Sequence, residues 1–388
     1  MKEIYLDNAA ATPIDGRVQR AMTQGMNAMG NPSAFNDAGR HAGKILDTAR
    51  TDVARFLNAH TDEIIFTSSA SESNTLAIVG GAFANRDKKH TDIITSPIEH
   101  ASVLEPLQWL ATQGFTIRSV RVDNEGRISI DDIEKKLMPQ TLFISLIYAS
   151  NEVGTIQPIA RIGKLVREFR AKHKSPFPLF HVDACQGTGH LPMNVQSLGV
   201  DLLTFNGSKI YGPRGVGVLY IRRGTQVMPI IRGGLHERGM RAGTPNVPAA
   251  VGLARALELL EQKHEQRLRK LSDHFFSKLA IVLPDARVNG PIGRDRLPNI
   301  LNISIPDLES QKLLIELDKW GIRAGSGSAC TAHSVQSSHV IKALRVPRKY
   351  QTGTLRFSLG RQNTKRDMDY LLRVLPKIVK DLKKRYHS

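Results

Sequence analysis

Short apolar runs that alternate with amphipathic helical segments place the strongest constraint on how this chain can fold. A helix is predicted over 39–59, where Ile45, Ala49, Val53 and Phe56 recur on one face. Buried strands are predicted at 92–96, 142–149, 178–184, 201–205 and 216–221. Strands separated by helices typically form a mostly parallel sheet that helices cover. The pattern therefore predicts an α/β domain.

A second, smaller α/β unit is predicted toward the C-terminus. Residues 248–284 are typical of a long helix, with room for one short break, that leaves the first domain. Two further strands are predicted at 298–306 and 354–360. We expect a large domain at 16–258 and a small domain built from 1–15 and 259–388. A chain of 388 residues, 41% of them hydrophobic, is long enough for two such cores.

Lys209 and Asp183 each follow a predicted strand, and together they indicate a cofactor site. Ligands of open α/β sheets bind outside the carboxyl ends of the strands. A lysine can hold an aldehyde as a Schiff base, and a carboxylate beside a pyridine nitrogen keeps that nitrogen protonated. A lone lysine after a strand is more often a solvated loop residue. The pair nevertheless predicts pyridoxal 5'-phosphate as the cofactor.

Residues 64–83 are predicted to supply the phosphate-binding end of a helix. They form a strand, a serine-rich turn and an apolar helix, which places Ser69, Ala70 and Ser71 at the helix N-terminus. Free N–H groups and the helix dipole favour an anion at that position. An ordinary N-cap explains this segment equally well. No Walker lysine or GxGxxG follows a strand, which favours a phosphate smaller than a nucleotide.

The chain resembles the cysteine desulfurases, which are fold-type I enzymes of the class V aminotransferase group. The resemblance extends over nearly the whole chain and implies a large domain with a mostly parallel, seven-stranded sheet between helices and a small α/β C-terminal domain. The matching segments follow one another in the family's order at 5–15, 31–40, 66–78, 97–103, 150–159, 181–186, 209–217, 233–244, 325–334 and 355–361.

The resemblance implies a role at the cofactor ring for five residues. Lys209 would bind the cofactor aldehyde, Asp183 would pair with the pyridinium nitrogen, and Gln186 would reach the ring hydroxyl oxygen. His100 would lie on the ring face and transfer protons, since imidazole titrates near neutral pH. Asn151 would face the same ring oxygen and the substrate. Buried histidines and asparagines are more often core residues, so the joint order of the five carries the assignment.

Arg356 and Thr244 would complete the site. The resemblance implies that Arg356 binds the substrate carboxylate, for which a bidentate guanidinium is well suited. Thr244 would reach the phosphate across the interface of a homodimer. The remaining phosphate contacts would come from Ser69, Ala70, Ser71, Asn206 and Ser208. The chain departs from the family here, because Asn206, Gly207 and Ser208 replace the usual Ser-x-His and because serines replace a Gly and a Thr. We therefore expect an altered cofactor affinity.

Cys330 is predicted to be the nucleophile that accepts sulfur. It lies in 324–340, whose Gly, Ser, Ala and Thr residues predict a mobile loop. With two cysteines in 388 residues, a disulfide scaffold is excluded. The other one, Cys185, suits the ordinary role of a small buried residue. The resemblance implies that Cys330, as thiolate, takes sulfur from L-cysteine, leaves L-alanine and carries a persulfide. No resident metal is expected, although Cys330 could serve as a transient iron–sulfur ligand.

Two other classes of function use the same features differently. A selenocysteine lyase or an aminotransferase would share the cofactor but leave Cys330 without a task. A non-catalytic binding protein would not need both Lys209 and Asp183. Measuring alanine and sulfide released from L-cysteine separates these alternatives.

Charge predicts the kind of partner. The net charge of +18 favours acidic partners, such as an acidic sulfur acceptor or an iron–sulfur scaffold protein. Iron–sulfur cluster assembly and tRNA thiolation are both consistent with this charge, and tRNA stays an alternative partner although no nucleic-acid module is present. No apolar run approaches the roughly 18 residues of a membrane span, so we expect a cytoplasmic protein without a membrane partner.

Overall fold

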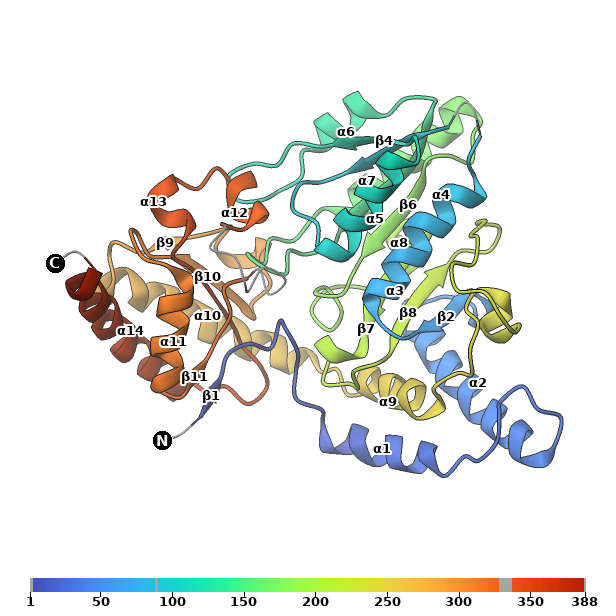
Figure 1. Cartoon of the computed structure of the whole chain (residues 1–388), viewed down its shortest axis with the longest axis horizontal. Coiled ribbons are helices and arrows are strands. Elements are labelled where there is room, and N and C mark those ends of the chain that lie inside the picture. The colour runs from blue at the N-terminus through green and yellow to red at the C-terminus, as the bar shows by residue number, and fades with distance from the viewer. Residues whose placement is uncertain (1–2, 88–89, 328–336, 387–388) are drawn as a thin grey trace.

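The computed structural model describes residues 3–87, 90–327 and 337–386. Its largest element is a seven-stranded sheet in the order β2-β8-β7-β6-β5-β3-β4 (Figure 1). Its strands are β2 (Ile64–Thr67), β3 (Asp92–Thr95), β4 (Thr116–Ser119), β5 (Thr141–Ile147), β6 (Leu179–Asp183), β7 (Leu202–Asn206) and β8 (Gly217–Ile221). The pairings among β4, β3, β5, β6 and β7 are parallel, and β8 runs antiparallel to both of its neighbours. The predicted α/β class and mostly parallel sheet are therefore confirmed.

Helices cover both faces of this sheet. Because successive side chains of a strand point to opposite faces, Phe143 and Ile144 belong to different hydrophobic clusters. One cluster packs the strands against α2, α7 and α9, and the other packs them against α4, α5 and the π-helical turn that follows α3. The helices of this part are α1 (Gly16–Met26), α2 (Asp37–Leu57), α3 (Ala70–Thr75), a π-helical turn (Leu76–Gly80), α4 (Gly81–Ala84), α5 (Ala101–Thr112), α6 (Ile130–Lys136), α7 (Ile159–His173), α8 (Val195–Leu198) and α9 (Val247–Glu258).

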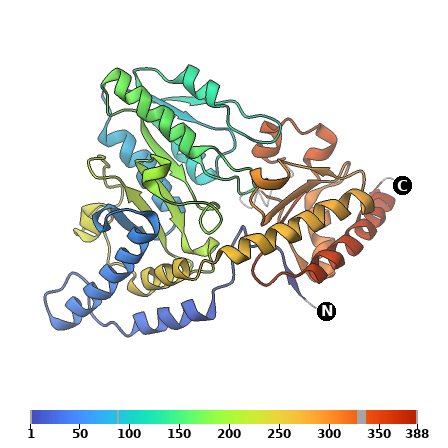
Figure 2. The ribbon, with the colours of Figure 1, turned by 180° about the vertical axis from the view of Figure 1, so that it is seen from behind.

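The C-terminal part has a cluster of its own, formed by Ile4 and Leu6 together with side chains between Leu268 and Leu382. Three of its strands form an antiparallel sheet, namely β9 (Arg287–Val288), β10 (Ile300–Ser304) and β12 (Thr354–Ser358). The other two, β1 (Ile4–Tyr5) and β11 (Ile322–Arg323), form a separate parallel pair. Its helices are α10 (Gln262–Val282), α11 (Ser310–Lys319), α12 (His339–Ala343), α13 (Arg348–Gln351) and α14 (Lys365–Tyr386). Figure 2 shows α10 extending from the end of α9 along this part of the molecule.

Short helical turns complete the chain at Thr61–Glu63, Gly207–Lys209, His236–Gly239 and Gly293–Asp295. The turn at Gly207–Lys209 follows β7 directly and so places Lys209 at the carboxyl edge of the large sheet. In the described part of the chain, no helix has the length and apolar character needed to cross a membrane.

Candidate active site

A cavity of about 560 Å³ lies at the carboxyl ends of β5, β6 and β7, where the large sheet faces the C-terminal part. This volume is typical of a small-molecule site. Ten of the residues predicted for the site line it, namely Ser69, Ala70, Ser71, His100, Asn151, Asp183, Gln186, Asn206, Lys209 and Arg356. The fold therefore brings together side chains that come from six separate stretches of the sequence.

Lys209 enters the cavity from the helical turn after β7. Its Nζ donates a hydrogen bond to the backbone carbonyl oxygen of Ala10, 2.6 Å away. The same N-terminal segment holds the turn itself, because the Thr12 N–H donates to the carbonyl oxygen of Ser208 at 2.9 Å. Burial lowers the pKa of Lys209 below its ordinary value. A larger fraction of Lys209 is therefore in the neutral amine form than would be the case in water. The neutral amine is the form that reacts with a carbonyl.

Asp183 is the last residue of β6, and two donors fix its carboxylate. Asn74 Nδ2 donates to Oδ2 at 2.9 Å, and the backbone N–H of Cys185 donates to Oδ1 at 3.0 Å. Asn74 also donates to Ser102 Oγ at 2.9 Å. Asp183 is buried, with 3% of its surface exposed. A buried carboxylate that is held in this way is suited to pair with a cationic ring nitrogen.

His100 is the N-cap of α5, and its ring is fixed from one side. The backbone N–H of Ser102 donates to Nδ1 at 3.1 Å, and Ser102 Oγ lies 2.8 Å from the same nitrogen. Because Nδ1 accepts a hydrogen bond, the proton of the neutral ring is on Nε2. Burial lowers the pKa of His100, so that the neutral form dominates near pH 7.

The predicted phosphate-binding residues lie at the start of a continuous helical stretch, Ala70–Ala84. Ser69 caps it, because its Oγ accepts from the Glu72 N–H at 3.1 Å. Asn206 lines the same cavity, and among the described residues its buried Oδ1 has no hydrogen-bond partner. Arg241 reaches this region through its Nε, which lies 2.9 Å from the Glu72 carboxylate.

Arg356, in β12, lies on the opposite side of the cavity from the sheet. Its Nη1 donates to the carbonyl oxygen of Asn151 at 3.0 Å, and its Nη2 donates to Asp7 Oδ1 at 2.9 Å. Its Nε is buried, with no partner in the part of the chain that the structure describes. An unpaired buried donor costs about 1–3 kcal/mol. Gln186 also has a fixed side chain, since its Nε2 donates to the Ala9 carbonyl oxygen at 3.0 Å.

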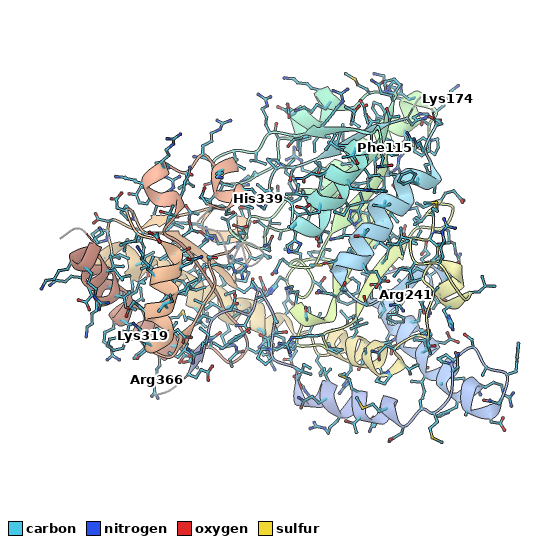
Figure 3. The ribbon with its side chains drawn as sticks, in the orientation of Figure 1. Phe115, Lys174, Arg241, Lys319, His339 and Arg366 are labelled. Carbon is cyan, nitrogen blue, oxygen red and sulfur yellow. The ribbon has the colours of Figure 1, made fainter. Side chains whose placement is uncertain are left out.

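Three predicted residues are not among those that line the cavity in the described chain. Ser208 uses its backbone carbonyl oxygen to hold Thr12. Thr244 is exposed, and its predicted contact across a dimer interface stays a prediction. Cys330 lies outside the described residues, as does most of the predicted 324–340 loop. Gly327 and His339, which precede and follow that stretch, both line the cavity, and Figure 3 labels His339 in the middle of the molecule.

Several residues of the cavity were missed by the sequence analysis. They include Glu99, Ser102, Glu152 and His339, and their one local signal is proximity to predicted residues such as His100 and Asn151. Glu99 is fully buried and accepts a hydrogen bond from Ser96 Oγ at 2.5 Å. Burial raises the pKa of Glu99 to about 8, so it is mostly protonated at neutral pH.

Cys185, which was predicted from the sequence to be a small buried residue, also lines the cavity. Burial, reinforced by the charge of Asp183, raises the pKa of its thiol well above the usual range. The reactive thiolate is therefore strongly disfavoured at this position.

Comparison with known proteins places these features in a family. The family described as aminotransferase class-V matches residues 4–371. A cysteine desulfurase IscS of Dictyoglomus turgidum is 43% identical over 387 residues, which cover 98% of this chain and 96% of that protein. A solved NifS-like protein is similar with a TM-score of 0.89 and 35% identity, covering 98% of this chain and 100% of that one. A structure described as SspA in complex with cysteine has a TM-score of 0.79 and 32% identity, covering 92% and 99% respectively.

Proposed function

Because this chain belongs to the class V aminotransferases and, within them, to the cysteine desulfurases, we propose that it is a pyridoxal phosphate enzyme that removes sulfur from L-cysteine. One observation carries the proposal. Lys209 and Asp183 line the same cavity as His100 and Arg356, at the carboxyl ends of parallel strands. An amine, a carboxylate, an imidazole and a guanidinium are the groups that such a reaction needs.

The cavity fits the cofactor chemically. Lys209 would hold its aldehyde carbon, Asp183 would face its ring nitrogen, and the start of α3 would bind its phosphate through Ser69 and Ser71. The unpaired Oδ1 of Asn206 leaves one more polar atom at this site without a partner in the described chain. When bound, the cofactor would supply an electron sink for the charge that develops on the substrate's Cα.

Lys209 and His100 would move the protons. The Lys209 amine would remove the proton from the substrate's Cα, and its lowered pKa favours the basic, neutral form that this role requires. His100 would present a protonated Nε2, because Nδ1 is held by the backbone N–H of Ser102. It would therefore act as a hydrogen-bond donor near the reacting atoms.

Arg356 would bind the carboxylate of L-cysteine. Arg356 lines the cavity, and its guanidinium is suited to a ligand carboxylate. The solved relative that is described in complex with cysteine, at 32% identity, supports an amino acid of this kind as the ligand.

Cys330 would take the sulfur. Its thiolate would attack the substrate's Sγ, the Cβ–Sγ bond would break with its electron pair left on carbon, and protonation there would give L-alanine. Cys330 would then carry a persulfide, so that no external oxidant or reductant is required. Gly327 and His339, on either side of the cysteine in the sequence, line the cavity and support this role.

The persulfide sulfur would pass to an acidic acceptor, for which we favour a protein of iron–sulfur cluster assembly. Four basic residues are exposed just beyond the cysteine segment, on and around α12 and α13, namely Lys342, Arg345, Arg348 and Lys349. A positive surface of this kind attracts acidic partners and speeds their association. Transfer RNA is the polyanionic alternative, and identifying the molecule that receives the sulfur from loaded protein distinguishes the two.

The cofactor assignment is tested by absorbance and covalent trapping. Purified protein should absorb in the visible, because a Schiff base conjugated with the cofactor ring does so. Borohydride reduction should then fix the cofactor on the peptide that contains Lys209. Lys209→Ala should lose both the covalent link and the release of alanine from L-cysteine. A colourless wild type that gains no colour when supplied with pyridoxal phosphate would contradict the proposal.

A further inference from the structure

The guanidinium of Arg356 already has a carboxylate partner inside the protein. Asp7 Oδ1 lies 2.9 Å from Nη2, and the side chains are 26% and 3% exposed. Three segments meet here, because the backbone of Asp7 pairs with Ser358 and that of Gly325 pairs with Arg356. A Cβ at Gly325 would lie 3.0 Å from Asp7 Oδ1 and 3.2 Å from Arg356 Nη2. Glycine at this position thus leaves room for the ion pair.

The donors of Arg356 are used unequally. Nη1 donates to two backbone carbonyl oxygens, those of Asn151 at 3.0 Å and Gly327 at 3.4 Å, and these carry no net charge. Nη2 meets Asp7, while Nε has no partner among the described residues. Within that part of the chain, Asp7 is the one carboxylate that bonds to this guanidinium. The charge of the arginine is therefore compensated inside the protein.

This arrangement has opposite effects on the empty and the occupied site. A buried guanidinium without a counter-ion is costly, so Asp7 stabilises the empty site. A bound substrate carboxylate would bring a second negative charge to the same guanidinium, because Arg356 lines the cavity and already bonds to Asp7. Two carboxylates that bond to the same guanidinium repel each other, and a partly buried site screens this repulsion less than water does. Asp7 should accordingly weaken the binding of anionic ligands.

We propose that Asp7 is the internal counter-ion of Arg356 and that it lowers the affinity of the site for ligands that bear a carboxylate. The inference rests on the proposed function of Arg356 as the substrate-carboxylate ligand. Asp7 is a positioning residue in this scheme, since it acts on the substrate through the arginine. If Asp7 merely held Arg356 in place, neutralising it would weaken the binding of carboxylate ligands instead of strengthening it.

The test compares two ligands that differ in one charge. Calorimetric titration of the cofactor-loaded enzyme with L-alanine, the expected product, measures binding of a carboxylate ligand, and titration with L-alaninamide measures the same ligand without that charge. Asp7→Asn keeps an oxygen acceptor for Nη2 and removes the charge. We expect this variant to bind L-alanine roughly tenfold more tightly, as about 1.4 kcal/mol of relieved repulsion would give, and L-alaninamide as the wild type does.

Asp318→Asn is the matched control, because Asp318 lines the same surface groove as Asp7 but pairs with Arg323. It should leave both affinities unchanged. If Asp7→Asn folds poorly, Asp7→Ser removes the same charge and should show the same ligand selectivity. Weaker or unchanged L-alanine binding in the Asp7 variants, or equal shifts for both ligands, would overturn the inference. A wild type that releases no alanine from L-cysteine would instead contradict the proposed function itself.

Discussion

For single residues, burial favours the protonation states on which the proposed chemistry depends. Burial lowers the pKa of Lys209 and of His100, which favours a neutral amine and a neutral imidazole. It raises the pKa of Cys185, which keeps that thiol protonated. Because the thiolate is the nucleophilic form, Cys185 is poorly suited to attack sulfur. The same physical cause thus activates the lysine and leaves Cys330 as the cysteine expected to react.

The effect of burial on protonation can be measured at Glu99. Its pKa is raised from 4.5 to about 8, so between those values the native state binds more protons than the unfolded state. The free energy of unfolding contributed by Glu99 therefore falls as the pH rises through this window. Glu99→Gln removes the titration but keeps an acceptor for Ser96. We expect the Tm difference, variant minus wild type, to increase by about 2 °C or more between about pH 5 and pH 8.5.

Thermal unfolding followed by circular dichroism at several pH values measures this difference. Asp62→Asn, at an exposed ion pair with Arg223, is a control in which the Tm difference should not rise across the same window. A difference for Glu99→Gln that stays constant or falls with pH would show that Glu99 is not a buried, protonated acid.

At the scale of elements, the sequence was most informative where apolar side chains repeat. The helix predicted at 39–59 is α2, Asp37–Leu57, and the long helix predicted at 248–284 is α9 and α10 with a break between them. The edge strand β4 was missed, because its Thr116–Ser119 side chains are only partly buried and form no apolar run. The hydrophobic pattern of a sequence indicates which side chains are buried. A partly exposed strand that is held by backbone hydrogen bonds therefore gives only a weak pattern.

Close packing of α7 against α8 gives a prediction at this scale. A Cβ on Gly163 would overlap the backbone carbonyl oxygen of Leu198, and backbone cannot yield as a side chain can. We expect Gly163→Ala to destabilise the protein by about 2–4 kcal/mol, despite the better helix propensity of alanine. Gly16→Ala, in the first turn of α1, meets only the flexible end of Arg20 at 3.8 Å and should be neutral or slightly stabilising. Urea denaturation of the two variants measures both, and equal stabilities would contradict the packing argument.

At the scale of the whole molecule, the site depends on contacts that no local pattern reveals. Asn74 and Asp183 are 109 residues apart, and Asp7 and Arg356 are 349 residues apart. The resemblance to a family predicted the cavity residues because it aligns them one by one, whereas Asp7, Asn74 and Glu99 follow only from the folded geometry. The separate C-terminal cluster includes Ile4 and Leu6, whereas Ile14 packs against a cluster of the large sheet. The division into 16–258 and a unit of 1–15 with 259–388 stays a prediction.

Assembly gives a prediction of its own. Three large apolar side chains are unusually exposed, namely Phe35 (93%), Met29 (78%) and Leu235 (88%). Such exposure favours a surface that another subunit covers. We expect a homodimer in which Thr244 of one subunit completes the site of the other. Light scattering should give twice the 42.9 kDa subunit mass.

Mixed dimers test the shared site directly. Lys209→Ala and Thr244→Ala proteins, each impaired alone, should regain activity when co-refolded, because one site per mixed dimer is then intact. Mixing either variant with itself is the control. No recovery in mixed dimers would mean that both residues act within one subunit.

Peptide mass spectrometry after a single turnover measures whether Cys330 receives the sulfur of L-cysteine. Wild type and Cys185→Ala should each release one L-alanine per site and gain the mass of one sulfur atom on the peptide that contains Cys330. Cys330→Ser should bind cofactor and L-cysteine, as judged by the change in visible absorbance, yet form no persulfide and release almost no alanine. A persulfide on Cys185 in the wild type, or full turnover by Cys330→Ser, would contradict the account.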